Sequence, residues 1–206
     1  MDILKAYMQM SQSNSLQLDQ FFGGSPFTEP EKSPFERLGD GYELRPIELS
    51  KEESDDKYIV DSKYSNLYHN GLKVSNLIFR KGGLGGIFKD GYCQLIHYVR
   101  DKKRARGFSS GEHVIVNGLG EIVLKAKQSG DYPYHDGGNV AHMKDLYYDL
   151  RTSRPFMVKS SDSIDGKNTI IVNHRYDWCG KDLNIPVGIY LIDKETCKVT
   201  KIDEIK

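Results

Sequence analysis

The chain has 206 residues, with 29 Lys and Arg balanced by 29 Asp and Glu, so its formal net charge at pH 7 is zero. Hydrophobic residues make up 38% of it, and 13 Tyr accompany 8 Phe, which is enough apolar mass to bury a core. These values exclude a chain that is disordered throughout, and the length favours one domain with appendages over two domains.

The first 56 residues are predicted to form an N-terminal arm. Apolar residues recur at helical spacing in residues 3–8, which indicates one short amphipathic helix. Two Ser-Pro-Phe phrases follow at residues 25–27 and 33–35, where each Pro fixes φ and blocks a helix or strand. We therefore expect an extended segment with aromatic anchors after the helix.

Charge is divided unevenly between this arm and the rest of the chain. Residues 1–56 contain 5 basic and 12 acidic residues, a charge of −7, and the remainder carries 24 basic and 17 acidic residues, a charge of +7. The charged run at residues 50–57 marks the predicted boundary, so a β-rich domain is expected over residues 57–206. The asymmetry suggests an arm that folds over its own basic body, or two surfaces for different partners.

From Tyr58 onward, short β-prone runs alternate with Gly, Asn and Asp, which is typical of hairpins. Asp90-Gly91 predicts the first turn because Gly accepts positive φ. Asn117, Asp149 and Asp193 begin three further turns, where each side chain can accept backbone N–H bonds. These residues are therefore interpreted as structural rather than catalytic. The four predicted hairpins cover residues 86–96, 114–124, 146–158 and 188–199.

The predicted fold class is mainly β: a single antiparallel, hairpin-rich domain with a short N-terminal helix and an extended arm. The domain could be a curved sheet, a small barrel or a sandwich. A closed propeller is not expected, because a ring needs about four blades of about 40 to 50 residues and the β-rich part is too short.

Two stretches resemble the WG-type (KWG-like) bacterial β-hairpin repeat. One is Tyr64-Ser65-Asn66-Leu67-Tyr68-His69-Asn70-Gly71-Leu72-Lys73-Val74 with the hairpin after it, and the other is Tyr134-His135-Asp136-Gly137-Gly138-Asn139-Val140 with residues 146–157. The last hairpin echoes the pattern, whereas the Trp-Gly pair of the family is absent. The resemblance implies a binding module and no particular reaction.

The densest polar cluster surrounds two histidines. Tyr134, His135, Asp136 and His142 bring imidazoles, a carboxylate and a phenol into nine residues. Imidazoles titrate near neutral pH and also bind metals, so the cluster could act in recognition, in acid–base catalysis or in metal binding. Gly137 argues against a helix that would place both imidazoles on one face, and a polar loop between strands is the simplest interpretation.

A second candidate recognition loop follows a predicted strand. His174, Arg175, Tyr176 and Trp178, the only Trp, gather basic and aromatic side chains there. Cys179 adds a thiol, but no known cysteine-enzyme phrase surrounds it. Recognition is therefore the function expected of this loop.

The third candidate is the only concentrated basic stretch, residues 100–106. Lys102, Lys103, Arg104 and Arg106 stand near aromatic residues, a combination that suits phosphate contacts and base stacking. The alternative is a solvated hairpin loop.

The remaining features exclude several classes of protein. Three widely spaced cysteines predict neither a disulfide framework nor a structural zinc. The Gly-rich residues 82–86 lack the Gly-Lys-Ser/Thr ending of a phosphate loop, and no cofactor is expected. No secretory signal and no apolar stretch of membrane-spanning length occurs, so the cytoplasm is the expected compartment and no membrane contact is expected.

The sequence therefore predicts a non-enzymatic protein-interaction module of bacterial or phage type, such as an inhibitor, an immunity-type protein or a virion-associated protein. A protein partner is expected, nucleic acid is an alternative partner through residues 100–106, and homo-oligomerisation stays open. The alternative function is a small His-dependent or metal-dependent hydrolase, such as a nuclease, which uses His135, Asp136, His142 and His174. That alternative requires the imidazoles to converge in one pocket.

Overall fold

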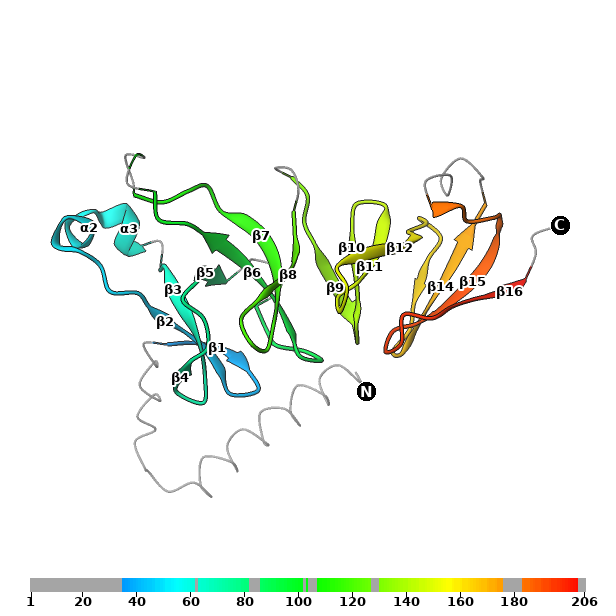
Figure 1. Cartoon of the computed structure of the whole chain (residues 1–206), viewed down its shortest axis with the longest axis horizontal. Coiled ribbons are helices and arrows are strands. Elements are labelled where there is room, and N and C mark those ends of the chain that lie inside the picture. Colours follow the sequence, from blue (N-terminus) through cyan, green and yellow to red (C-terminus); the bar gives the residue numbers. More distant parts are fainter. Residues whose placement is uncertain are drawn as a thin grey trace, which may run out of the picture. The chain divides into compact units, whose positions relative to one another are not determined.

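The computed structural model describes residues 35–61, 63–81, 86–101, 103, 107–126, 130–175 and 183–203, which belong to one compact unit, Phe35–Lys206 (Figure 1). Residues 1–34 form the other unit of the chain. The predicted short helix and both Ser-Pro-Phe phrases, apart from Phe35, lie outside the described residues.

The first sheet has eight strands in the order β1-β2-β3-β5-β6-β7-β8, with β4 paired to β3. All of its pairs are antiparallel, and neighbours in the sheet are mostly neighbours in the sequence. Its strands are β1 (Glu36–Gly39), β2 (Tyr42–Pro46), β3 (Ser65–His69), β4 (Leu72–Lys73), β5 (Ile78–Lys81), β6 (Tyr92–Tyr98), β7 (Glu112–Asn117) and β8 (Ile122–Lys125).

Two four-stranded antiparallel sheets follow, and each is a meander of consecutive strands. The second sheet contains β9 (Tyr134–Gly137), β10 (Val140–Met143), β11 (Leu146–Asp149) and β12 (Arg154–Val158). The third contains β13 (Ile164–Asp165), β14 (Thr169–His174), β15 (Gly188–Asp193) and β16 (Val199–Asp203). Figure 1 colours these sheets yellow-green and orange to red. The prediction of a mainly β, hairpin-rich, antiparallel fold is confirmed, and the described strands form open sheets rather than a closed barrel.

The predicted turn chemistry is present at the Asx positions. The Asn117 side chain accepts hydrogen bonds from the backbone N–H groups of Leu119 and Glu121, both at 3.0 Å. Asp193 accepts from the backbone N–H of Thr196 at 2.7 Å. At Asp90-Gly91 both residues have positive φ, 51° and 82°, the conformation that a two-residue type I′ hairpin turn requires.

Successive sheets share their cores. One cluster of buried residues belongs to the first sheet, a second joins the first sheet to the second sheet, and a third joins the second sheet to the third. The second sheet therefore buries side chains on both faces: Ala141 and Tyr148 pack toward β7 and β8, while Val140 and Tyr147 pack toward β14 and β15. Alternation of side chains along a strand explains this division.

Two short helices, α2 (Lys51–Asp55) and α3 (Lys57–Asp61), connect β2 to β3. Ser50 caps α2 by accepting from the N–H of Glu53, whose carboxylate accepts from the N–H of Ser50, a complete capping box. Ile59 packs with Tyr64 and Phe108 in a small core of its own.

The start of the β-rich unit differs from the predicted boundary at residue 57. β1 and β2 form a hairpin inside the first sheet, and β2 pairs with β3 over five residues from Tyr42↔His69 to Pro46↔Ser65. Leu38 and Leu44 of this hairpin are almost completely buried in the first core. The hairpin belongs to the sheet because these two leucines complete its core.

Within the described part of the chain, no helix has the length and apolar character needed to cross a membrane.

Candidate functional site

The histidine cluster predicted from the sequence lies on one hairpin of the second sheet. Tyr134 and His135 belong to β9 and His142 to β10, and Tyr134 pairs directly with His142. Their rings stack, with centroids 5.1 Å apart. Because side chains alternate along a strand, His135 points to the opposite face of the sheet from Tyr134 and Asp136.

His142 is held from both sides of its ring. Its Nδ1 lies 2.8 Å from each carboxylate oxygen of Asp136, and its Nε2 lies 2.8 Å from Nζ of Lys159. An ammonium group can only donate, so Nε2 accepts from Lys159 and Nδ1–H donates to Asp136. The side chains of His142 and Asp136 are only 17% and 14% exposed.

Asp136 also takes part in a second polar contact through its backbone. Nζ of Lys194, in the turn between β15 and β16, donates to the carbonyl oxygen of Asp136 at 2.6 Å and pairs with the Asp165 carboxylate at 2.6 Å. Lys194 is almost completely buried. We call the five side chains Lys159, His142, Asp136, Lys194 and Asp165 the polar seam, because they lie between the second and third sheets.

The polar seam has little capacity for acid–base chemistry as it stands. A general base needs a lone pair that faces the substrate, and the one lone pair of the His142 ring already accepts from Lys159. Lys194 likewise gives its hydrogen bonds to Asp136 and Asp165. The buried Lys194 ammonium donates from the third sheet to the Asp136 carbonyl in the second, while its other partner, the Asp165 carboxylate, is 63% exposed. The seam therefore fixes the third sheet against the second.

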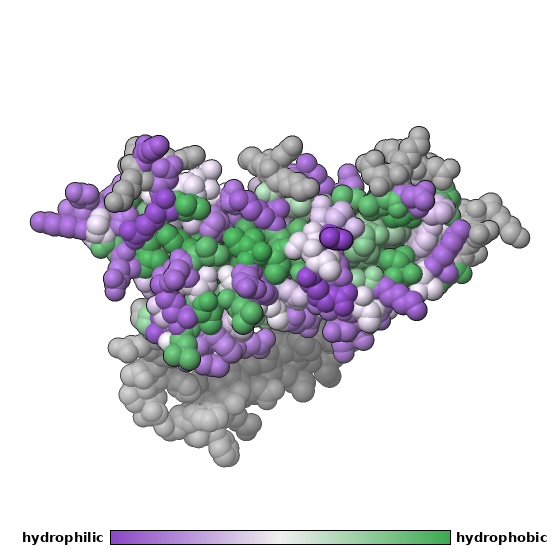
Figure 2. Space-filling view, in the orientation of Figure 1, coloured by the Kyte–Doolittle hydropathy of each residue, from purple (hydrophilic) through white to green (hydrophobic). Residues whose placement is uncertain are grey.

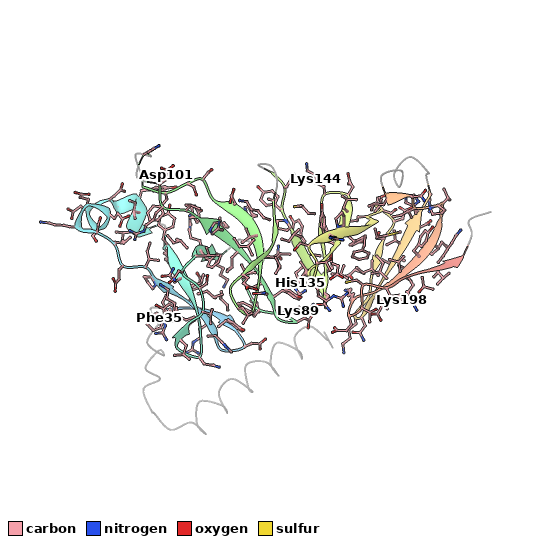
Figure 3. The ribbon with its side chains drawn as sticks, viewed as in Figure 1. Phe35, Lys89, Asp101, His135, Lys144 and Lys198 are labelled. Atoms are coloured by element: carbon pink, nitrogen blue, oxygen red, sulfur yellow. The ribbon has the colours of Figure 1, made fainter. Side chains whose placement is uncertain are left out.

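His135 faces the first sheet instead. Its ring meets that of Tyr92 edge to face, with centroids 5.5 Å apart, and its Nε2–H donates to the carbonyl of Gly138 at 3.0 Å. Burial holds the pKa of His135 below the ordinary histidine value, and the Gly138 bond offsets part of that shift. Figure 3 labels His135 beside Lys89 of the first sheet.

His174 is the last residue of β14 and is 2% exposed. Neither of its ring nitrogens has a hydrogen-bond partner within the described part of the chain. The next residue, Arg175, is exposed and pairs with Asp162 at 3.0 Å. Tyr176 and Trp178, the other predicted residues of this loop, lie outside the described residues.

In the described part of the basic run, Arg100 makes structural contacts. Arg100 donates to the carbonyl of Glu48 at 2.7 Å, pairs with Glu53 at 3.3 Å and lies over the Phe108 ring. It thus ties α2 to the loop after β6. Lys103 is exposed, whereas Lys102, Arg104 and Arg106 lie outside the described residues.

The histidines proposed for a hydrolase are therefore distributed over two faces and two sheets. His135 contacts the first sheet, His142 belongs to the polar seam, and His174 lies in the third sheet with neither nitrogen bonded. The described residues contain no group of three His, Cys, Asp or Glu side chains placed to hold a metal ion.

The described thiols are poor nucleophiles. Burial raises the pKa of Cys93 to about 12 and that of Cys197 to about 11. A thiol reacts as the thiolate, so neither cysteine is activated at neutral pH.

Two members of the polar seam, Asp136 and His142, were predicted from the sequence, whereas Lys159, Asp165 and Lys194 were not. These three come from turns and strand ends that are 17 to 58 residues away from their partners. No local pattern marks them, because a Lys in a hairpin turn is normally exposed.

These features define a class: a protein of stacked antiparallel sheets with a structural polar seam and no assembled catalytic centre among the described residues. No family model matches the chain, and the comparisons with curated proteins and with solved structures find no similar protein.

Proposed function

We propose that the protein is a non-catalytic protein-interaction module that binds its partner through the turns at one end of the first sheet. The carrying observation is the exposure of three aliphatic side chains there: Leu72 is 75% exposed, Leu119 69% and Ile87 66%. We call these three residues the turn surface. In Figure 2 hydrophobic residues reach the surface at the turns of β4 and of β7–β8.

The three residues of the turn surface are arranged around one ring, that of Tyr42. Tyr42 stacks on His69, the strand partner of Leu72, with centroids 4.1 Å apart. It stacks on Phe88, the neighbour of Ile87, at 3.7 Å. Its hydroxyl donates to the carbonyl of Gly118, which precedes Leu119, at 3.1 Å. The Tyr42 ring therefore contacts the strand partner of Leu72 and the chain neighbours of Ile87 and Leu119.

Exposed aliphatic side chains in turns favour binding over folding as their purpose. Leu119 lies in the β7–β8 turn, where a polar residue is usual, and Leu72 begins β4 directly after a turn. A large side chain that stays in water contributes little to the core. Exposed apolar residues on a firm support are typical of protein–protein interfaces. The resemblance to WG-type repeats, which are binding modules, supports the same proposal. We also propose a cytoplasmic location for the protein.

The hydrolase alternative is not favoured. It required His135, His142 and His174 to converge, but His135 faces the first sheet and His142 lies on the opposite face of the second sheet. The lone pair of His142 is also occupied by Lys159.

The test is a pull-down with tagged full-length protein from host lysate, beside the triple variant Leu72→Ser, Ile87→Ser, Leu119→Ser. The control is Ile164→Ser, Ile202→Ser, which removes two comparably exposed side chains from the third sheet. We expect one specific protein to be retained by the wild type and the control and lost from the triple variant, with all three folded by circular dichroism. Equal retention by the triple variant would refute the proposal.

A further inference from the structure

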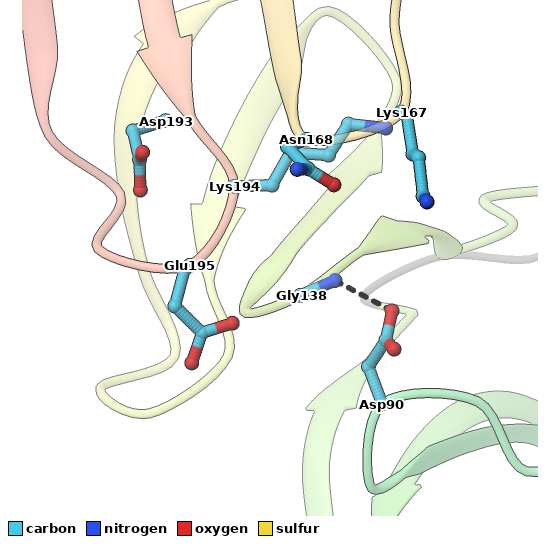
Figure 4. A pocket seen from close by; sticks show the side chains of 7 residues that line it. All are labelled: Asp90, Gly138, Lys167, Asn168, Asp193, Lys194 and Glu195. Atoms are coloured by element: carbon cyan, nitrogen blue, oxygen red, sulfur yellow. Dashed lines mark hydrogen bonds between the residues drawn. The ribbon is translucent and has the colours of Figure 1, made fainter.

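A cavity of about 360 Å³ lies where turns of all three sheets meet (Figure 4). The first sheet contributes Asp90 and the second contributes Gly138. The third contributes Lys167, Asn168 and the turn residues 193–195. Apart from Gly138, every described residue that lines it has a polar or charged side chain.

The floor of this cavity is firmly built. The backbone N–H of Gly138 donates to Asp90 Oδ2 at 2.9 Å, the bond drawn in Figure 4. Next to it, the Asn139 N–H donates to the Lys194 carbonyl at 2.7 Å, and the Asn139 amide donates to the Glu195 carbonyl at 2.5 Å. Three sheets are thus joined by hydrogen bonds around one point, which preorganises whatever lines the cavity.

Some of the polar groups that line the cavity are already used by the fold. The Lys194 ammonium belongs to the polar seam. The Asp193 carboxylate accepts from the N–H and hydroxyl of Thr196, both at 2.7 Å. One oxygen of Asp90 accepts from Gly138.

Other groups at the rim have no assigned partner. Within the described residues, no hydrogen bond or ion pair involves the side chains of Lys167, Asn168 or Glu195, and Asp90 Oδ1 is also without one. The rim therefore presents one ammonium, one amide and one carboxylate, together with the second oxygen of another. Figure 4 shows Lys167 and Asn168 on one side of the space, with Glu195 and Asp90 on the other.

We propose that this cavity binds a small zwitterion, a free α-amino acid with a polar side chain. The carboxylate of the ligand would pair with Lys167 and Asn168, and its ammonium would pair with Glu195 and the second oxygen of Asp90. Charge-assisted hydrogen bonds of both signs suit a ligand of zero net charge. The volume lies at the lower end of small-molecule sites, which fits a ligand of amino-acid size. This site is separate from the turn surface and does not depend on the proposed function.

The first experiment is isothermal titration calorimetry of the full-length protein with a panel of polar L-α-amino acids, repeated with their N-acetyl and methyl ester forms. We expect at least one free amino acid to bind and both blocked forms to lose binding at least tenfold. No binding by any member of the panel at millimolar concentration would overturn the proposal. Undiminished binding of either blocked form would also overturn it, because one of the two charge contacts would then be wrong.

Variants locate the binding within the molecule. Glu195→Gln and Lys167→Gln each remove one charge from an exposed side chain with no assigned partner, and each is expected to weaken binding at least tenfold while the fold is kept. The controls are Lys198→Gln, in the same hairpin but outside the cavity, and Glu52→Gln, on α2. Binding that is unchanged in both cavity variants would place the ligand elsewhere and overturn the assignment.

Discussion

Gly138 lies where the second sheet closely approaches the backbone of the third. Its φ is +54°, and a Cβ at this position would lie 2.5 Å from the carbonyl oxygen of Lys194. A side chain is therefore excluded twice, by backbone conformation and by contact with another backbone.

Gly138→Ala is expected to lower the free energy of unfolding by about 3 kcal/mol, since a left-handed backbone costs about 1–2 kcal/mol and overpacking typically adds about 1–3 kcal/mol. The matched control is Gly91→Ala. Gly91 also has positive φ, +82°, but nothing lies within 4 Å of its Cβ position, so about 1 kcal/mol is expected. Urea unfolding of both variants measures the difference. Equal losses would show that the Lys194 backbone moves aside to accommodate the added Cβ.

His174 and His142 make a second pair for comparison. The buried nitrogens of His174 lack partners in the described structure, whereas both nitrogens of His142 are bonded. An unsatisfied buried polar group costs about 1–3 kcal/mol. His174→Leu should therefore leave the free energy of unfolding unchanged or raise it, and His142→Leu should lower it by about 1–3 kcal/mol because Asp136 loses its partner. Thermal unfolding distinguishes the two, and a loss on His174→Leu as large as that on His142→Leu would contradict this account.

His135 gives a prediction for pH. Burial holds its pKa below the ordinary value, so near pH 6 the unfolded chain binds more protons than the folded one. The stability that this residue contributes is complete above the ordinary histidine pKa of about 6.5 and is lost as pH falls toward the folded pKa. Burial also lowers the pKa values of His97 and His113, so all three histidines contribute to the loss of stability at low pH.

His135→Gln retains a donor for Gly138 and removes the titrating group. We expect the decrease in unfolding free energy between pH 7.5 and 5.5 to be smaller in this variant than in the wild type, as measured by urea unfolding at each pH. A decrease as large as that of the wild type would show that His135 does not contribute.

At the scale of elements, the β1–β2 hairpin decides where the β-rich unit begins. Leu38 and Leu44 fill the first core from this hairpin, and the backbone N–H of Phe88 donates to the Leu38 carbonyl at 2.6 Å. Any truncation beyond Phe35 therefore removes core side chains and not merely an arm.

Deletion of residues 1–50 is expected to abolish cooperative unfolding, because burial of the two leucines and pairing along β2 and β3 are lost together. Each buried Leu is worth about 2–5 kcal/mol when truncated to Ala, and the total stability of a domain is about 5–15 kcal/mol. Deletion of residues 1–34 is the control, since it removes no described strand, and it should retain one sharp thermal transition. A sharp transition in the longer deletion would contradict the role given to this hairpin.

Turn chemistry predicted the hairpins β7–β8, β11–β12 and β15–β16 and the turn before β6. The strand predicted over residues 86–89 is not present, and β6 pairs with β5 and β7 instead. Asp90-Gly91 and the Asx residues at 117, 149 and 193 act locally, through backbone groups two to four residues away, so their effect can be recognised without tertiary contacts. The β1–β2 turn has the same signature, Asp40-Gly41 with φ of 48° and 76°. It escaped prediction because β1 has four residues and one buried side chain, too few to display a period of two.

The candidate site was less predictable because most of its contacts join residues that are far apart in the sequence. Asp136 and His142 sit six residues apart and could be grouped from sequence, and their contact at 2.8 Å follows from one hairpin. Lys159 reaches His142 across the strands of the second sheet, and Lys194, which pairs with Asp165, reaches Asp136 only through packing of the third sheet on the second. The three aliphatic tips around Tyr42 depend likewise on turns brought together by the first sheet.

At the scale of the whole unit, the second sheet has a core on each face, and the polar seam and the cavity floor reinforce its contact with the third sheet. Separation of the third sheet from the second would expose apolar area and break the hydrogen bond from Lys194 to the Asp136 carbonyl. We therefore expect the three sheets to unfold together.

Native-state hydrogen exchange tests this expectation. Amides of Val114–Val116 in β7 and of Ile170–Val172 in β14 lie in different cores and should report the same free energy of opening, equal to the global value from urea unfolding. A lower value at β14 alone would mean that the third sheet detaches by itself.

The order of strands also bears on how the chain is made. Among the described strands nearly every pairing joins consecutive strands, and β3 with β5, the exception among them, skips only the two-residue β4. Each sheet can therefore complete its hydrogen bonds before the next has left the ribosome, and local pairing of this kind carries a small loop-closure cost. The first sheet would then offer an ordered surface on which the second and third assemble in turn as synthesis proceeds.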